Sequence, residues 1–296
     1  MKKIIVGFDG TDQAKDALHL GAAIAEVFDA ELIVASAIEY GPDPILEMEG
    51  YENYNDTKRE HFDKVFNQAR AELGNRVFER RELQDTAAHG LTDLGEAANA
   101  DLVVVGSTHH GPIGRVFAGT VAARLFHGAP CAVMVAPRGW SEREHTGLGL
   151  IGVGYDGSDE SKQALALAEK LAKALDAKIR VITVAPYTGV DAHLGPVEVM
   201  REVWAESLKE AVDSVSERIE TEGVLRQGRP ATELALQAVE LDLLVVGSRA
   251  YGPLRRTLVG SVSGEFVGTA PCPVLVVPRG VESRQETEAE QPVAVA

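Results

Sequence analysis

Residues 102–107 read Leu-Val-Val-Val-Gly-Ser, and residues 243–248 read Leu-Leu-Val-Val-Gly-Ser. Each run is short, continuously apolar and closed by a glycine, which is typical of a strand buried on both faces of a parallel sheet. The two runs belong to a longer repeat, because Asp101–Gly139 aligns with Asp242–Gly280 without a gap and 19 of these 39 residues are identical. The sequence therefore predicts two copies of one fold.

The beginnings of the two copies match as well. Ile4–Tyr40 aligns without gaps on Ile151–Tyr187, and the apolar runs lead into Val-Gly-Phe-Asp-Gly in the first copy and Val-Gly-Tyr-Asp-Gly in the second. A polar, glycine-bearing stretch separates the copies, and the end of the chain is rich in Glu without a core pattern. We expect domains at residues 1–140 and 148–281, a linker at 141–147 and a disordered acidic tail at 282–296.

Each copy alternates short apolar runs with segments of helical periodicity. One segment, Asp12–Phe28, places its apolar residues at helical spacing, and a second helix is marked by the apolar residues between Phe62 and Leu73. The expected strands are Ile4–Phe8, Leu32–Ile38, Leu102–Val105, Ala132–Val135, Leu243–Val246 and Val274–Val277. This order predicts an α/β fold of two tandem doubly wound domains, each an open, mostly parallel five-stranded sheet with helices on both faces.

Composition limits the partners of the chain. The 296 residues carry a formal net charge of −16, which repels nucleic acid and anionic membrane surfaces. Neither a signal-peptide pattern nor an apolar run of about 20 residues is present. The two cysteines, Cys131 and Cys272, favour a reducing cytosol over a disulfide scaffold, and small buried packing is their expected role. An anionic ligand must then be held by backbone N–H groups and a few Arg side chains.

Two loops in each copy are placed to hold a ligand, because ligands of such sheets bind beyond the carboxyl ends of the strands. One loop follows the first strand and presents Asp9 or Asp156. The other follows the apolar run at Gly106 or Gly247, and a second Gly-Ser/Thr pair later in this loop would start a helix whose N-terminus favours phosphate. The spacing matches neither the Walker pattern nor the dinucleotide fingerprint.

The spacing Gly-x-x-Gly-(nine residues)-Gly-Ser/Thr after a strand resembles the ATP loop of the universal stress proteins. The Asp after the first strand and the closing run Ala270–Pro278 strengthen this resemblance, which covers both copies. It implies a Rossmann-like fold that binds ATP, with or without Mg²⁺, in a cytoplasmic stress-response or signalling protein. It also implies pairing of the closing strands in a homodimer or between the two halves, an unknown protein partner and no catalytic residue.

The resemblance also implies a role for each position of the motif. Asp9 and Asp156 would contact the adenosine, the backbone at Ala37 and Val184 would contact the adenine edge, and the glycine loops would hold the phosphates. The full set of implied contacts is Gly7, Asp9, Ala37, Gly106, Ser107, Thr108, His109, Gly111, Gly119, Thr120 and Val121 in the first half, and Gly154, Asp156, Val184, Gly247, Ser248, Arg249, Ala250, Gly252, Gly260, Ser261, Val262 and Ser263 in the second.

The sequence departs from the motif at one position in each half. His109 and Ala250 replace the second glycine, which costs about 1 kcal/mol or more if this position needs a positive φ. In addition, Ala-His-Gly at residues 88–90 stands where the second half has Gly-Arg-Pro at 228–230. We therefore expect the second site to bind at least as tightly as the first.

Other interpretations of the same residues remain open. Asp9 and Asp156 are also typical helix caps, as are Thr120 and Ser261. Arg115 and the pair at 255–256 are either phosphate contacts or solvated surface charge. A metal at His109 and His110 is disfavoured, because adjacent side chains point apart and no third ligand has suitable spacing. For the whole chain, the alternatives to an ATP-binding signalling protein are a slow ATP hydrolase and an interaction module with vestigial loops.

Overall fold

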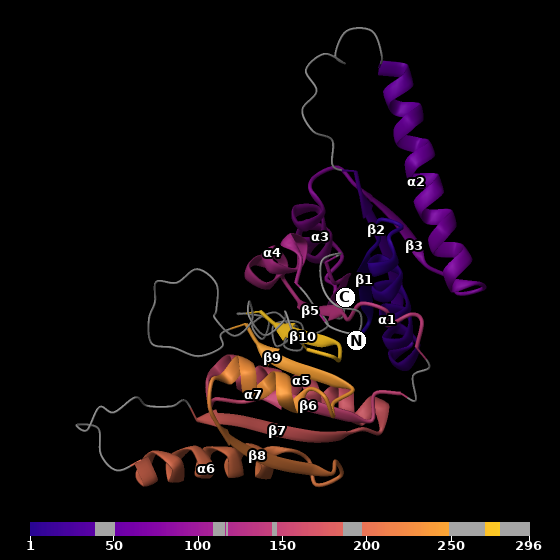
Figure 1. Ribbon diagram of the computed structural model, residues 1–296. Coiled ribbons are helices and arrows are strands. Elements are labelled where there is room, and N and C mark those ends of the chain that lie inside the picture. Colours follow the sequence, from indigo (N-terminus) through magenta and orange to yellow (C-terminus); the bar gives the residue numbers. More distant parts are fainter. Residues whose placement is uncertain are drawn as a thin grey trace, which may run out of the picture. The chain divides into compact units, whose positions relative to one another are not determined.

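The computed structural model describes residues 1–38, 51–108, 116, 118–143, 147–185, 197–248 and 270–278 (Figure 1). Contacts divide the chain into two compact units. The first comprises Met1–Ala129, Val133–His145 and Gly268–Pro273, and the second comprises Pro130–Ala132, Thr146–Val267 and Val274–Ala296. The units are described one at a time below.

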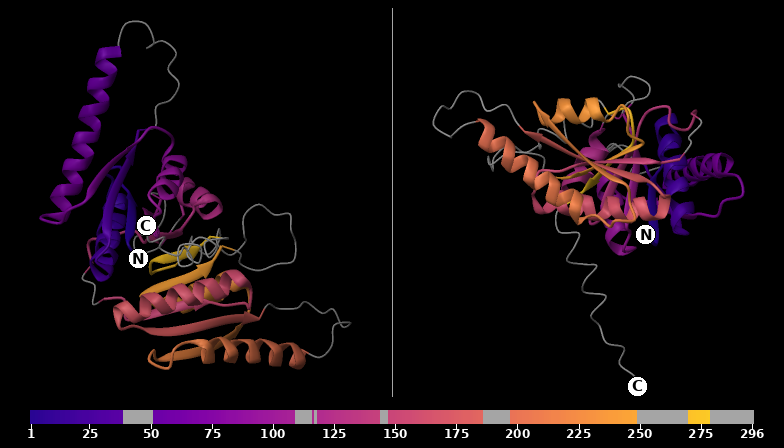
Figure 2. Two further views of the ribbon diagram at one scale, coloured as in Figure 1. Left: turned by 180° about the vertical axis from the view of Figure 1, so that it is seen from behind. Right: turned by 90° about the horizontal axis from the view of Figure 1, so that it is seen from below.

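The first half forms a five-stranded sheet in the order β3-β2-β1-β4-β5. Helices α1 and α2 lie on one face of this sheet, and α3 and α4 lie on the other (Figure 2). The elements are β1 Lys3–Gly7, α1 Asp12–Phe28, β2 Glu31–Ala37, α2 Tyr51–Leu73, β3 Glu79–Leu83, α3 Ala87–Ala97, β4 Leu102–Gly106, α4 Thr120–Gly128 and β5 Ala132–Ala136.

The second half repeats this topology, with its sheet in the order β10-β9-β6-β7-β8. Helices α5 and α6 cover one face and α7 the other (Figure 2). The elements are β6 Leu150–Gly154, α5 Asp159–Leu175, β7 Lys178–Ala185, α6 Val197–Ser214, β8 Thr221–Gln227, α7 Pro230–Gln237, β9 Leu243–Gly247 and β10 Val274–Val277. The predicted fold class, a doubly wound parallel α/β sheet in each half, is confirmed.

The central strands are buried on both faces, which explains their continuous apolar sequences. In the first half β1 lies between β2 and β4 and runs parallel to both, with Ile4 opposite Leu102 and Val6 opposite Val104. All four of these side chains are fully buried. In the second half β6 takes the same place between β7 and β9. The loop that follows the first strand of each half therefore lies at the middle of the sheet.

A repeated aspartate fixes the start of each central strand. The Asp101 carboxylate accepts a hydrogen bond from the N–H of Lys3 at 3.0 Å and another from the N–H of Lys2. The Asp242 carboxylate accepts one from the N–H of Leu150 at 2.9 Å. Each aspartate lies directly before the fourth strand of its half, so it satisfies an amide that has no ladder partner at the strand end.

Asp242→Ala should lower the stability of the second half by about 1–3 kcal/mol, because the partly buried N–H of Leu150 loses its acceptor. The loss is measured by urea unfolding of the full chain, followed by hydrogen exchange in β6. Asp242→Asn is the matched control, since the amide oxygen can still accept this bond. Equal stability of the two variants would contradict the assignment.

Candidate functional site

The carboxyl ends of β1 and β4 lie side by side at the point where the strand order reverses. Connections leave neighbouring strands toward opposite faces at such a point, which opens a crevice where α/β sheets bind ligands. The loop after β1 contains Asp9 and Thr11, and the loop after β4 begins with Ser107 and Thr108. In the second half the loops after β6 and β9 occupy the matching places.

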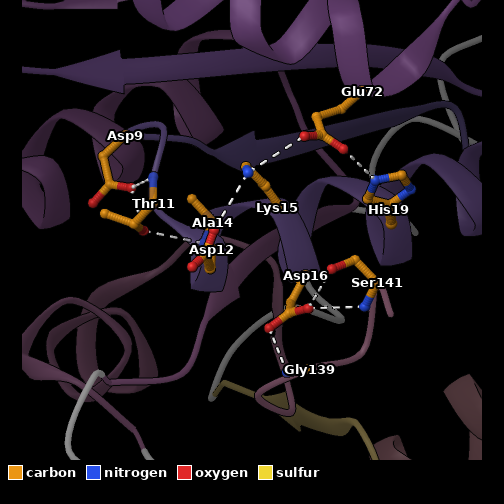
Figure 3. Close-up of polar contacts among 10 residues, drawn as sticks. All are labelled: Asp9, Thr11, Asp12, Ala14, Lys15, Asp16, His19, Glu72, Gly139 and Ser141. Carbon is orange, nitrogen blue, oxygen red and sulfur yellow. Dashed lines mark hydrogen bonds and ion pairs between the residues drawn. The ribbon is translucent and has the colours of Figure 1, made fainter. Parts of the chain in front are cut away.

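In the loop after β1, an aspartate orients the residue that caps α1 (Figure 3). Asp9 Oδ1 accepts hydrogen bonds from the N–H of Thr11 at 3.0 Å and from its hydroxyl at 2.6 Å. Thr11 Oγ1 in turn accepts a bond from the N–H of Ala14 at 3.3 Å, and Thr11 is the N-cap of α1. The helix cap is thus Thr11, and the interpretation of Asp9 as the cap itself is wrong.

The second half builds the same loop. Asp156 Oδ1 accepts bonds from the N–H of Ser158 at 3.0 Å and from its hydroxyl. Ser158 is the N-cap of α5, and its Oγ accepts a bond from the N–H of Ser161 at 3.2 Å. In the part of the chain that the structure describes, these bonds use Oδ1 of each aspartate, and Oδ2 of Asp9 and of Asp156 takes no part in them.

The glycine at the end of the fourth strand is required by the first helix of each half. An ideal Cβ on Gly106 would lie 2.2 Å from the backbone oxygen of Gln13, and one on Gly247 would lie 2.8 Å from the backbone of Glu160. Gln13 and Glu160 lie in the first turns of α1 and α5. The motif implies only that Gly106 and Gly247 open the phosphate loops. The structure shows that they also let the helix approach the strand end.

The two ends of the first glycine loop lie next to each other. An ideal Cβ on Gly119 would lie 3.1 Å from Cγ2 of Thr108, although ten residues separate the two positions in sequence. Gly119 is the N-cap of α4 and makes no side-chain cap bond, while Thr120 is the first residue of the helix and Val121 the second. Of the two interpretations left open for Thr120, the one that makes it the N-cap is therefore excluded, and the phosphate contact stays a prediction. The first amides of α4 thus lie beside the loop after β4.

Several implied contacts have structural roles. The hydroxyl of the buried Ser107 donates to the backbone oxygen of Ala136 at 2.9 Å, so it ties β4 to β5. The N–H of Ser248 donates to the backbone oxygen of Val277 at 2.8 Å. These bonds fix the start of each glycine loop to the neighbouring strand, and they withdraw the Ser107 hydroxyl and the Ser248 amide from a ligand.

Gly7 and Gly154 serve the packing of a helix on the other face of the sheet. Ideal Cβ atoms would lie 3.1 Å from Leu91 of α3 and 3.4 Å from Leu234 of α7, respectively. Both leucines are almost completely buried. At Gly154 the atom nearest to an ideal Cβ is Cγ1 of Val246 at 3.1 Å, so close packing gives both glycines a structural role beside the implied ligand contact.

Ala37 and Val184 lie at the carboxyl ends of β2 and β7, as the resemblance implied for the adenine contact. Ala37 pairs in register with Leu83 of β3, and Val184 pairs with Arg226 of β8. The neighbouring Tyr155 is buried, and this burial raises the pKa of its phenol above the ordinary value. The tyrosine therefore remains neutral at physiological pH.

The segments that the sequence analysis compared at 88–90 and 228–230 differ in structure. Residues 88–90 lie within the first turn of α3, where His89 pairs with Asp85 at 2.8 Å. Residues 228–230 precede α7, with Arg229 as N-cap and Pro230 as the first helical residue. Proline is favoured there because its missing N–H would have no partner in the helix. Leu83 pairs with Ala37, and Arg226 pairs with the matching Val184, so residues 228–230 correspond to 85–87. The expectation that 88–90 stands in the place of 228–230 is therefore wrong.

Part of the implied contact set lies outside the described residues. It comprises His109, Gly111, Arg249, Ala250, Gly252, Gly260, Ser261, Val262 and Ser263, together with His110, Arg115, Arg255 and Arg256. Within the described residues, no three His, Cys, Asp or Glu side chains gather as a metal site would need. None of the helices described is both long and apolar enough to cross a membrane.

A cavity of about 370 Å³ lies beside the N-terminal part of α1. Its lining comes from α1, from Glu72 near the end of α2 and from the turn after β5. On the α1 side Lys15 pairs with Asp12 at 3.3 Å and with Glu72 at 3.5 Å. The hydrogen bond that Lys15 donates to Asp12 and the negative charge of Glu72 raise the pKa of Lys15, so the lysine stays charged.

Comparison with known proteins identifies relatives across both halves. The model of the universal stress protein family matches residues 1–137 and 149–278. A curated universal stress protein of Mycobacterium tuberculosis is 27% identical over 301 residues, which covers 93% of this chain and 99% of the relative. A relative from Thermus aquaticus is 37% identical over 131 residues, covering 42% of this chain and 93% of the relative. The crystal structure of a universal stress protein from Archaeoglobus fulgidus aligns with a TM-score of 0.68 and 18% identity, covering 94% of this chain and 98% of that one.

Gly106→Ala should destabilise the first half by roughly 1–3 kcal/mol, because the added methyl group meets the backbone of α1. Gly247→Ala should cost less in the second half, since its closest approach is 2.8 Å rather than 2.2 Å. Hydrogen exchange in β4 and β9 during urea titration measures each loss separately. Gly128→Ala is the control, because no atom lies within 4 Å of its ideal Cβ. A Gly106→Ala protein as stable as this control would refute the close approach.

Proposed function

Because the chain belongs to the universal stress protein family, we propose that it binds ATP, and that nucleotide occupancy tunes its conformation or its binding of a partner protein. The observation that carries this proposal is the meeting of Gly119 with Thr108 in the first half. It brings the start of α4 beside the loop after β4, where amide N–H groups from both can face one anion. Such a helix start favours phosphate through its unpaired N–H groups and its dipole.

Charge sets the orientation of the nucleotide. A chain of net charge −16 offers a triphosphate little general attraction, so local amides must hold it. The carboxylates of Asp9 and Asp156 would repel the phosphates but can accept hydrogen bonds from hydroxyl groups. We therefore place the nucleoside at the loops after β1 and β6, near Ala37 and Val184, and the phosphates at the glycine loops.

The alternatives make different predictions for the purified protein. A slow ATP hydrolase would release phosphate in a turnover assay, whereas an ATP-binding signalling protein would retain its nucleotide. An interaction module with vestigial loops would bind no nucleotide. Mass spectrometry of the supernatant after denaturing protein purified without added nucleotide separates the last alternative from the other two. Recovery of ATP or ADP near the protein concentration supports the proposal, and its absence together with no calorimetric binding refutes it.

We further propose that the protein is cytoplasmic and that it assembles as a homodimer or through its two related halves. Its protein partner is unidentified. Light scattering of the purified chain with and without ATP and Mg²⁺ measures the assembly and its dependence on nucleotide.

Asp156→Ala should weaken ATP binding to the second half by about 0.5–1.5 kcal/mol, or up to about 3 if the lost hydrogen bond is charge-assisted. The aspartate orients the Ser158 cap, so the variant should also lose some stability. Calorimetry gives the affinity, and thermal unfolding gives the stability.

Ser158→Ala is the matched control, because it removes the cap and leaves the Asp156 carboxylate in place. It should lower the melting temperature with little change in affinity. If Asp156→Ala also lowers only the melting temperature and its affinity stays within twofold of the parent, Asp156 orients the cap and nothing more.

ATP should bind the second half at least as tightly as the first, because Ala250 replaces the motif glycine with a smaller side chain than His109 does. Asp9→Ala and Asp156→Ala test this ranking better than changes at Gly106 or Gly247, which disturb the first helix of each half. Calorimetry should show the larger loss of overall ATP affinity for Asp156→Ala. Loss of all binding with Asp9→Ala and none with Asp156→Ala would reverse the ranking.

A further inference from the structure

A buried carboxylate on α1 holds the turn that leads out of the first half (Figure 3). Asp16 is 2% exposed, and its oxygens accept hydrogen bonds from the N–H of Gly139 at 2.7 Å and from the N–H and the hydroxyl of Ser141, each at 2.8 Å. Bonds to a charged acceptor are stronger than bonds between neutral groups. These two residues follow β5 directly and begin the connection to the second half. We call this arrangement the Asp16 clamp.

The helix that carries the clamp also touches both loops of the candidate nucleotide site. Its N-cap, Thr11, is oriented by Asp9, and the backbone oxygen of Gln13 lies against Gly106. Gln13 and Asp16 are three residues apart, so they lie on adjacent turns of one side of the helix. A helix segment moves as a unit, and a shift of its first turn therefore reaches the clamp.

The surroundings of the clamp include an open space beside the turn. A neighbouring side of α1 is held to α2 by the ion pair of Glu72 with Lys15 and by the contact of Glu72 with His19 at 3.1 Å. Between these pairs and the clamp lies the cavity of about 370 Å³, which Gly139, Ser141 and the residues beside them also line. The turn therefore borders open space on the side of this cavity.

The second half differs at the matching position. Gln163 replaces Asp16, and its buried Oε1 has no hydrogen-bond partner among the described residues. The residues that match Gly139 and Ser141 there lie outside those residues. In the described part of the chain, the clamp is therefore a feature of the first half.

We propose that α1 couples nucleotide occupancy of the first half to the start of the connection between the halves, with Asp16 as the positioning residue. This coupling rests on the proposed ATP binding and describes how nucleotide occupancy of that site affects the connection between the halves. A ligand that contacts the loops of Asp9 and Gly106 fixes the first turn of α1 and thereby stabilises the clamp. Coupling is reciprocal, so the clamp must also favour the nucleotide-bound state of the first half.

Hydrogen exchange of the full chain, measured by mass spectrometry with and without saturating ATP and Mg²⁺, tests the coupling. Peptides covering residues 137–143 report on the clamp, and peptides covering 101–108 report on occupancy of the first site. In the parent protein ATP should slow exchange in both. Asp16→Asn should speed exchange of the turn about tenfold without ATP, because an amide group replaces one accepting oxygen. It should also abolish the slowing of the turn by ATP.

Two further variants keep the test informative if Asp16→Asn folds poorly. Ser141→Ala removes only the hydroxyl bond, so it should give a smaller increase in exchange and a weaker response to ATP. Gln163→Ala changes the matching position of the second half and should leave exchange of residues 137–143 as in the parent.

The outcomes separate this coupling from the proposed function. ATP protection at 101–108 without any change at 137–143 overturns the coupling and leaves nucleotide binding intact. A turn that still responds to ATP in Asp16→Asn also overturns it, because Asp16 is then not the positioning residue. If calorimetry detects no ATP binding, both the proposed function and the coupling fall.

Discussion

The close approach of the first helix to the end of the fourth strand sets the geometry of each half. No side chain fits at Gly106, because the backbone of Gln13 occupies the place of a Cβ, and Gly247 meets Glu160 in the same way. This approach fixes where the helix begins, and the helix start in turn fixes the aspartate loop before it. One packing constraint therefore brings together the two loops that form the candidate site.

Much of this arrangement could be predicted from sequence because it depends on local patterns. The bounds of α1, Asp12–Phe28, and of β10, Val274–Val277, agree with the predicted ones, since helical spacing and a closed apolar run are local signals. The edge strand β3 was not predicted. Its sequence at 79–83 is Glu-Arg-Arg-Glu-Leu, and its side chains are mostly exposed, so it pairs through its backbone without an apolar pattern.

The parts that could not be predicted depend on residues far apart in the chain. Asp16 resembles an ordinary polar residue of an amphipathic helix, and its partners at 139 and 141 lie more than 120 residues away. The exact start of α4 is also hard to predict, because both Gly119 and Thr120 can precede a helix. The structure makes Gly119 the N-cap and Thr120 the first helical residue.

Because the chain contains two copies of one fold, features that both halves share can be compared with features that only one half has. The glycine contact, the capped aspartate loop and the aspartate before the fourth strand recur in both halves, and each has a structural role in the fold that the halves share. The two halves differ at the clamp, where Asp16 matches Gln163. A residue that differs between the halves is not required by their common fold, so it can have a function in one half only. The residues that distinguish the halves therefore say more about their separate roles than the motif that they share.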